Sequence, residues 1–155
     1  MRAVAGVIVV LVLPASTAAT VVPQRGMRGA RIGMTVSEVR ENVGKPTHIA
    51  FVRHPIIGRI RVWGYGRTRV TFDGDGRSAR VIAMDTTSRG ERLANGIGVG
   101  STRAAVDARV RGARCKVEFG HDHCYVGEFR AGEIVTDFLL RSGRVSRISV
   151  ARVID

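Results

Sequence analysis

Residues 33–46 read GMTVSEVRENVGKP and residues 100–113 read GSTRAAVDARVRGA, so one short pattern occurs twice at a spacing of 67 residues. Both stretches place a glycine, a threonine and two valines at the same points. The same spacing relates Gly76-Arg77 to Gly143-Arg144 near the end of each stretch. Two matches at one spacing indicate an internal repeat, which is typical of a fold built from two similar units.

The first copy begins with the signature of a helix N-terminus. Thr35 is expected to cap the helix, and Glu38 completes the arrangement called a capping box. The helix is expected to end at Gly44-Lys45-Pro46, because proline cannot continue a helix and restricts the residue before it. The second copy keeps a capping threonine, Thr102, but has Ala105 in place of the glutamate. We therefore expect a second helix without a capping box.

After each helix, short alternating segments separated by turn residues predict antiparallel strands. The expected strands cover residues 49–53, 59–65, 67–72 and 78–84 in the first copy, and 116–119, 125–129, 134–140 and 145–153 in the second. One helix followed by about four strands, twice over, predicts an α+β fold. The two units would form one roughly eight-stranded sheet, with both helices on one face.

The chain divides into five segments by composition. Residues 1–19 have a basic residue, an apolar run and then small residues, which is the layout of a secretory signal peptide cleaved near Ala19. The alternative is an uncleaved anchor, but the apolar run is shorter than the roughly 20 residues that span a bilayer. The remaining expected segments are a flexible leader at 20–31, repeat one at 32–86, a connector at 87–96 and repeat two at 97–155. The two repeats should share one core, since one alone would bury too little surface.

The chain is strongly basic. Its formal net charge is +12, and of its 25 basic residues only Lys45 and Lys116 are lysines. Such a charge favours long-range attraction to acidic proteins, nucleic acid or anionic polymers of the cell envelope. With the signal peptide removed and no stable membrane span left, we expect a secreted or periplasmic protein.

The two cysteines, Cys115 and Cys124, are expected to form a disulfide, because exported proteins fold in oxidising surroundings. Two alternatives are free thiols and a metal site that adds His121 and His123. Structural zinc sites usually supply their ligands as two spaced pairs, which a His-x-His-Cys run matches poorly. We expect no metal and no other cofactor.

The sequence contains no recognisable catalytic motif. A Gly-x-Ser-x-Gly elbow, a Walker loop and a His-Glu-x-x-His motif are all missing. The four histidines, at positions 48, 54, 121 and 123, fall in expected loops or strand ends, where histidine is usually solvated. We therefore expect a protein that is not an enzyme and has no small-molecule substrate.

The strand expected at 59–65 offers a candidate binding face. Successive residues of a strand point to opposite sides, so the side chains of Trp63 and Ile60 point to opposite sides of this strand. If the Ile60 side meets the helices, the Trp63 side is open to solvent. Arginine, tryptophan and tyrosine are typical of interface hot spots, and arginine binds carboxylate and phosphate groups through two hydrogen bonds. The expected binding face comprises Arg59, Arg61, Trp63, Tyr65, Arg67, Arg69, Arg80 and Arg147, with Arg147 as the counterpart of Arg80. The alternative is a solvated basic face on which Trp63 packs against arginine stems.

These motifs resemble a known family. The stretch from Val99 to Val106, followed by Gly112-Ala113-Arg114-Cys115 and by Cys124, is similar to the repeat unit of the secreted beta-lactamase inhibitory proteins. The opening of the first copy also resembles the single repeat of small outer-membrane assembly lipoproteins. The resemblance spans most of residues 31–155 and implies tandem helix-plus-four-strand repeats in an exported bacterial binding scaffold.

The chain departs from both groups in ways that bear on function. It has eight aromatic residues in all, its first repeat has no cysteine pair, and no cysteine lies near the cleavage region to carry a lipid. Neither beta-lactamase inhibition nor outer-membrane assembly therefore carries over. The expected function is binding of an acidic protein or an anionic envelope polymer. The alternatives are a structural envelope component without a discrete ligand site and a metal-binding protein.

Overall fold

The computed structural model describes residues 20–118 and 120–154, so the predicted signal peptide at 1–19 lies outside the described residues. The elements are β1 (Val21–Val22), β2 (Gly26–Met27), β3 (Ala30–Arg31), α1 (Val36–Val43), β4 (His48–His54), β5 (Gly58–Tyr65), β6 (Thr68–Phe72), β7 (Val81–Thr86), α2 (Arg103–Arg109), β8 (Arg114–Glu118), β9 (His121–Val126), β10 (Ile134–Arg141) and β11 (Arg144–Arg152). Neither helix in this part of the chain has the length and apolar character needed to cross a membrane.

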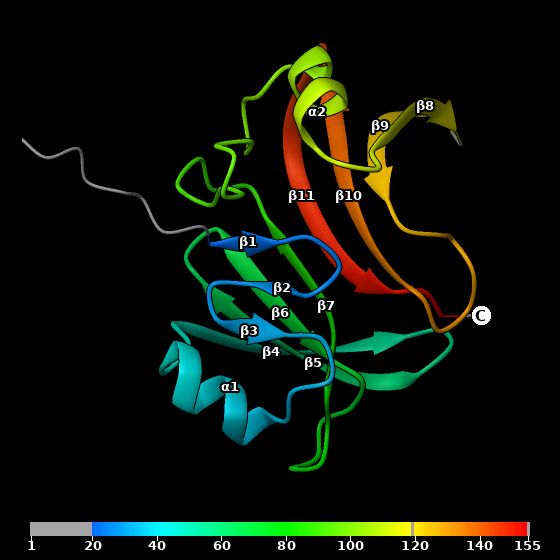
Figure 1. Cartoon of the computed structure of the whole chain (residues 1–155). Coiled ribbons are helices and arrows are strands. Elements are labelled where there is room, and N and C mark those ends of the chain that lie inside the picture. Colours follow the sequence, from blue (N-terminus) through cyan, green and yellow to red (C-terminus); the bar gives the residue numbers. More distant parts are fainter. Residues whose placement is uncertain (1–19, 119, 155) are drawn as a thin grey trace, which may run out of the picture.

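Eight strands form one antiparallel sheet in the order β4-β5-β6-β7-β11-β10-β9-β8 (Figure 1). The predicted α+β class and the eight-stranded sheet are therefore confirmed. Each half contributes one helix followed by four strands, and the halves join where β7 pairs with β11. That the halves are copies of one unit stays a prediction.

Matching hydrogen bonds tie the start of each helix to the sheet. The Arg80 guanidinium donates to the carbonyl oxygen of Gly33 at 2.9 Å, and the Arg144 guanidinium donates to that of Gly100 at 3.0 Å. Arg144 therefore occupies the place of Arg80, and the prediction that Arg147 is its counterpart is wrong. The first half has a longer turn before its last strand, so the 67-residue spacing no longer holds at that strand.

Both helix caps agree with the sequence prediction. In α1 the Thr35 backbone N–H donates to the Glu38 carboxylate at 2.7 Å, and the Glu38 N–H donates to the Thr35 hydroxyl at 3.3 Å. The Glu38 carboxylate accepts from the Thr35 backbone N–H and also from the Thr35 hydroxyl, at 2.8 Å, and these two bonds lower the pKa of Glu38 below its usual value. In α2 the Ala105 N–H donates to the Thr102 hydroxyl at 3.2 Å, without the reciprocal bond.

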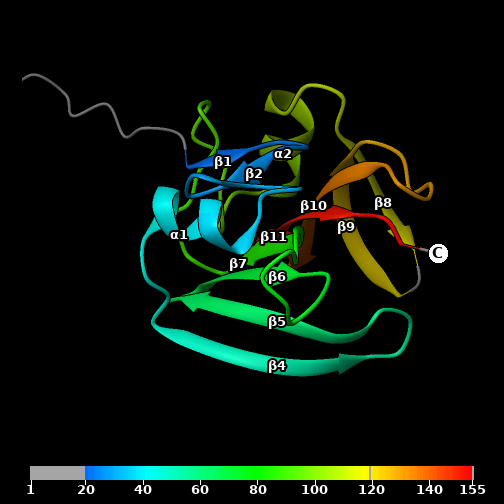
Figure 2. The same ribbon diagram turned by 90° about the horizontal axis from the view of Figure 1, so that it is seen from below.

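The core lies between one face of the large sheet and a layer made of α1, α2 and β1–β3 (Figure 2). Val39 of α1 and Val106 of α2 are completely buried in it. The strands contribute the residues that face the helices, including Trp63, Val70, Phe72, Met84, Phe138, Ile148 and Val150. We call this side of the sheet the helix-bearing face and the opposite side the helix-free face.

The segment at 20–31 is not a flexible leader. It forms a three-stranded antiparallel sheet, β1-β2-β3, in which Val21, Met27 and Ala30 are each only 1% exposed. Burial of these apolar side chains offsets the entropy lost when the segment is ordered. Gly26 is required at its position, because a Cβ there would collide with the Ala30 carbonyl oxygen.

The connector at 87–96 holds this segment in place. The Arg28 guanidinium contacts the Glu91 carboxylate at 2.7 Å, and the Glu91 side chain is 4% exposed. The N–H groups of Thr20 and Val21 both donate to the Arg92 carbonyl oxygen, at 2.9 and 3.0 Å. The connector is therefore part of the folded core layer, and its own Leu93 is buried in the core cluster.

Two strands lie a few residues from their predicted positions. The strand expected at 78–84 begins at Val81, because a turn closed by the Ala79 N–H and the Gly76 carbonyl precedes it and Arg80 forms an isolated bridge with Thr35. The strand expected at 125–129 is β9 at 121–126, which pairs with β8 around Cys115 and Cys124. The cysteine pair fixes this register, and Phe129 falls in the loop beyond it.

Candidate functional site

The predicted binding face is wrong at its two aromatic residues. Trp63 is 3% exposed and Tyr65 is 8% exposed, both within the core cluster. The Trp63 ring packs edge-on against Phe72 with centroids 5.1 Å apart, and Trp63 pairs across the sheet with Val70. The predicted alternation along β5 is correct, but its Trp63 side faces the helices. Burial of the large indole surface favours this choice of side.

Arg59 and Arg61 share the Trp63 side of β5 but lie beyond the covered core. Their guanidinium groups stand 4.8 and 5.6 Å from the ring centroid of Phe51 on β4. Arg59 also approaches the Asp75 carboxylate at 3.5 Å, and Arg61 donates to the Asp75 backbone carbonyl. These two arginines belong to the β4–β5 hairpin and not to the helix-free face.

Three of the predicted residues do come together. Arg67, Arg69 and Arg147 line one hollow of about 330 Å³, together with Gly66, Asp85 and Thr87. A second hollow of about 410 Å³ shares Thr87 and Arg147 and adds Arg141 and His121. We call Arg67, Arg69, Arg141 and Arg147 the arginine cluster.

The arginine cluster contains one internal ion pair. Arg69 of β6 binds Asp85 of β7 through its Nε, at 3.1 and 3.2 Å, and through its Nη2, at 2.8 Å. The two residues are direct cross-strand partners, so the register of β6 and β7 creates this pair. In the described part of the chain, no ion pair or hydrogen bond links the guanidinium group of Arg67, Arg141 or Arg147 to another residue. Three guanidinium groups are therefore free to bind an anion.

Sequence reasoning did not identify Asp85, Thr87 and Arg141. Thr87 and Arg141 lie at strand ends, and only the order of strands in the sheet brings them together. Arg80 was predicted to belong to this face, but its guanidinium bonds to Gly33 beside α1 and does not line the hollows. No local signal in the sequence distinguishes these arginines.

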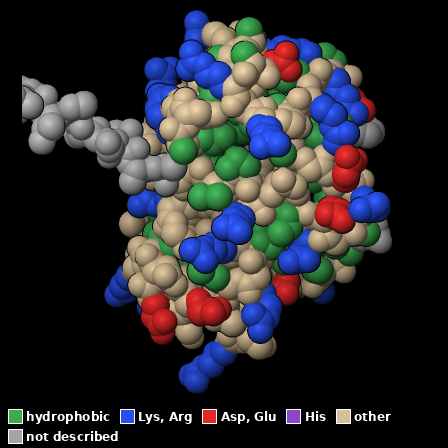
Figure 3. Space-filling model, in the orientation of Figure 1, with side chains coloured by type: hydrophobic (Ala, Val, Ile, Leu, Met, Phe, Trp, Pro, Cys, Tyr) green, Lys and Arg blue, Asp and Glu red, His purple; other side chains and the backbone are tan. Residues whose placement is uncertain are grey.

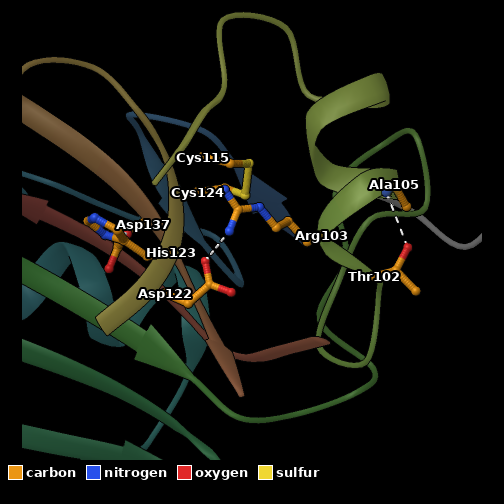
Figure 4. Close-up of a disulfide and its surroundings, with 8 residues drawn as sticks. All are labelled: Thr102, Arg103, Ala105, Cys115, Asp122, His123, Cys124 and Asp137. Atoms are coloured by element: carbon orange, nitrogen blue, oxygen red, sulfur yellow. Dashed lines mark hydrogen bonds and ion pairs between the residues drawn. A yellow bond between two sulfur atoms is a disulfide. The ribbon is translucent and has the colours of Figure 1, made fainter. Parts of the chain in front are cut away.

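The predicted disulfide is confirmed. Cys115 of β8 and Cys124 of β9 are direct cross-strand partners joined by a bond between their sulfur atoms. This bond leaves no thiolate for a metal site with His121 and His123. Figure 4 shows the disulfide beside the Arg103–Asp122 ion pair, which joins α2 to β9 at 2.6 Å.

His123 is buried, in contrast to the prediction that it is solvated. It lies on the other side of β9 from the disulfide (Figure 4), where its Nδ1 is 2.8 Å from the Asp137 carboxylate. Its Nε2 is buried without a hydrogen-bond partner and lies 3.7 Å from the Glu118 carboxylate. Tyr125 and Phe129 stack nearby, with ring centroids 4.9 Å apart. These aromatic rings bury the histidine that an isolated strand would leave exposed.

Asp137 gives a testable pH dependence. Burial raises the pKa of Asp137, and its hydrogen bond to His123 opposes that rise. A carboxyl group with a raised folded-state pKa favours the fold at low pH, and this contribution is lost as the pH rises through that pKa. Asp137→Asn keeps an oxygen that accepts from His123 and removes the charge. We expect the variant to melt at a higher temperature than wild type near pH 7, with the difference disappearing near pH 3.

Thermal unfolding followed by circular dichroism at both pH values measures this effect. Asp107→Asn, at an exposed site on α2, is the matched control and should leave the melting temperature nearly unchanged. A lower melting temperature for Asp137→Asn near pH 7 would show that the carboxylate charge stabilises the fold through His123.

No protein-family model, curated protein or solved structure matches this chain. The site must therefore be judged from its own geometry and charge.

Positive side chains are not confined to the arginine cluster. Figure 3 shows lysine and arginine side chains spread among apolar patches on the side that carries β1–β3. Net charge alone therefore does not locate a binding site. The arginine cluster differs because three guanidinium groups without ion-pair partners border two adjoining hollows that share Thr87 and Arg147.

Proposed function

We propose that this chain is an exported, non-enzymatic binding protein whose helix-free sheet face binds an acidic protein or an anionic polymer of the cell envelope. The arrangement of the arginine cluster carries the proposal. Its one lining carboxylate, Asp85, is already bound by Arg69, so Arg67, Arg141 and Arg147 would meet the negative charges of a partner. Guanidinium groups bind carboxylate, phosphate and sulfate oxygens through directed hydrogen bonds, and their low hydration makes that exchange favourable.

Two observations support export as part of this proposal. The first 19 residues have the composition of a signal peptide. The Cys115–Cys124 disulfide is of a kind that persists in oxidising compartments and is rare in the cytosol. Both support a secreted or periplasmic location.

The arrangement of the two halves supports a scaffold role. Each half has one helix, four strands and the same arginine-to-glycine bond at the helix start. We propose that they are copies of one unit, in keeping with the resemblance to the repeats of beta-lactamase inhibitory proteins. Such a scaffold supports a binding surface on its sheet without supplying catalytic groups.

Charge reversal in the arginine cluster tests the proposed function. Fluorescein-labelled polyglutamate and dextran sulfate serve as carboxylate and sulfate probes, with binding followed by fluorescence anisotropy. We expect Arg67→Glu with Arg147→Glu to weaken binding of at least one polymer about tenfold or more, because two charge-assisted hydrogen bonds contribute about 1.5 to 3 kcal/mol each. The loss should shrink as salt increases.

The matched control is Arg77→Glu with Arg89→Glu, which reverses two exposed arginines outside the hollows. It changes the net charge equally and should weaken binding less than about threefold. Equal weakening by both pairs would show that the polymers respond to net charge and not to the cluster. Failure of wild type to bind either polymer would instead favour the alternative function, a structural envelope component without a discrete ligand site.

A further inference from the structure

The large sheet has two edges that differ in how they are protected. β8 forms one edge and carries Arg114, Lys116 and Glu118, with the Lys116 ammonium 2.7 Å from the Glu118 carboxylate. The disulfide also ties this strand to β9. Alternating charges and a covalent link are typical means of keeping an edge strand from pairing with another chain.

The opposite edge, β4, is unprotected. All seven of its residues are exposed or half-exposed, and among the described residues β5 is its only neighbouring strand. Ile49, Phe51 and Val52 are 46%, 47% and 48% exposed, so apolar side chains are available on both sides of the strand. The strand contains neither lysine nor proline. A long apolar edge of this kind is a template for an additional strand.

The β4–β5 hairpin extends beyond the rest of the sheet. β4 pairs with β5 down to the turn, whereas β6 pairs with β5 only from Arg61 to Tyr65. The hairpin therefore ends as a two-stranded arm, which is visible in Figures 1 and 2. Ile56 at its turn is 59% exposed. A partner segment can approach this arm without displacing another described element.

Charge determines which kind of segment fits. Arg59 and Arg61 flank the exposed Phe51 ring, and Arg53 lies on the same side of β4. Asp75 is the acidic residue that contacts this group, at 3.5 Å from Arg59. A second copy of β4 would bring no negative charge to these arginines, because β4 contains no acidic residue. Because successive residues of a strand point to opposite sides, a strand that alternates apolar and acidic residues would set its acidic side chains on the Phe51 side, beside the arginines, and its apolar side chains on the Val52 side.

We propose that the β4 edge binds an extended segment of a partner protein, rich in β-branched and acidic residues, as a ninth strand of the sheet. Backbone hydrogen bonds along β4 supply affinity, while the arginines on the Phe51 side select acidic side chains and Val52 on the other side contacts apolar ones. This surface is separate from the arginine cluster and does not rest on the function proposed above.

The probe is a fluorescein-labelled ten-residue peptide in which valine and glutamate alternate. We expect it to bind wild type, and to bind at least tenfold more weakly to Phe51→Glu, because the added carboxylate lies among the arginines and repels the acidic side chains of the peptide. A peptide alternating valine and lysine should bind at least tenfold more weakly than the glutamate peptide. The same weakening is expected for the glutamate peptide with N-methyl groups on alternate residues, because methylation removes its backbone donors.

The matched control is Val117→Glu on β8, where the replaced side chain is 67% exposed. It should retain wild-type affinity within about twofold. Unchanged binding of the N-methylated peptide, or no binding of the unmodified peptide to wild type, would overturn the proposal. Sedimentation velocity tests a second copy as the occupant: a wild-type dimer that Phe51→Glu dissociates would also overturn it.

Discussion

Replacing Trp63 with alanine is expected to lower the free energy of unfolding by about 3 to 5 kcal/mol, the usual cost of removing a buried aromatic side chain. Trp63 is 3% exposed and packs against Phe72 at the centre of the core. The substitution leaves a large cavity on the helix-bearing face. Urea unfolding followed by circular dichroism measures the loss, because the variant no longer has the chain's only tryptophan as a fluorescent probe.

Two further variants test whether the loss of stability in Trp63→Ala comes from the burial of the indole ring. Trp63→Phe should cost about 1 to 2 kcal/mol, since the indole Nε1 is buried without a hydrogen-bond partner and its removal breaks no bond. Phe51→Ala, at an exposed site on β4, should change the free energy of unfolding by about 0.5 kcal/mol or less. If Trp63→Ala were as stable as Phe51→Ala, the tryptophan would lie on the surface.

Combining Val21→Ala with Met27→Ala is expected to lower the free energy of unfolding by about 3 to 6 kcal/mol, since each fully buried side chain contributes about 1.5 to 3 kcal/mol. Both residues are 1% exposed and belong to the core cluster. The segment at 20–31 holds few other core residues, so the double variant should also release it from the connector. Amide hydrogen exchange at residues 20–31 would then rise more than exchange in the large sheet.

The control for this pair is Val22→Ala with Arg25→Ala, two exposed residues of the same segment. Both contribute to the structure through backbone groups, since the Arg25 N–H donates to the Val22 carbonyl oxygen. This control should remain within about 0.5 kcal/mol of wild type. Equal stability of the two double variants would mean that residues 20–31 do not contribute to the core.

Much of the architecture could be predicted from the sequence because its signals are local. The capping residues Thr35 and Thr102, the valines of both helices and the turn glycines act within a few positions, and they placed both helices and eight strands. The three-stranded sheet at 20–31 gave no such signal. Its strands have two residues each, and their positions depend on Arg92 and Thr136, which are remote in sequence.

The sequence contains the information needed to predict on which side of the sheet Trp63 lies. Gly66-Arg67 is a two-residue hairpin loop that pairs Tyr65 with Thr68 and so sets Trp63 beside Val70. Val70 and Phe72 alternate with the polar Arg69 and Thr71, so the register of the hairpin assigns the Trp63 side to the core. The sequence of β5 alone does not decide which side is buried, because both of its sides carry apolar residues.

The composition of the arginine cluster could not be predicted from local sequence patterns. Arg67, Arg69 and Arg147 were predicted together, but for a face that also held Trp63 and Tyr65. Only the pairing of β7 with β11 brings Arg147 close to the β5–β6 turn. The burial of His123 likewise depends on Phe129 and Asp137 from other segments.

The bonds of the N-terminal segment have a consequence for the order of folding. The Gln24 N–H donates to the Thr136 hydroxyl, 112 residues further along the chain, at 2.6 Å. A chain is synthesised from its N-terminus, so residues 20–31 emerge before the connector that binds them through Arg92 and long before β10, which supplies Thr136. Contacts between such distant residues form slowly, because a long loop must close first. The segment that holds Val21 and Met27 is therefore fully fixed in place only after β10 has been made, although it is the first part of the described fold to be synthesised.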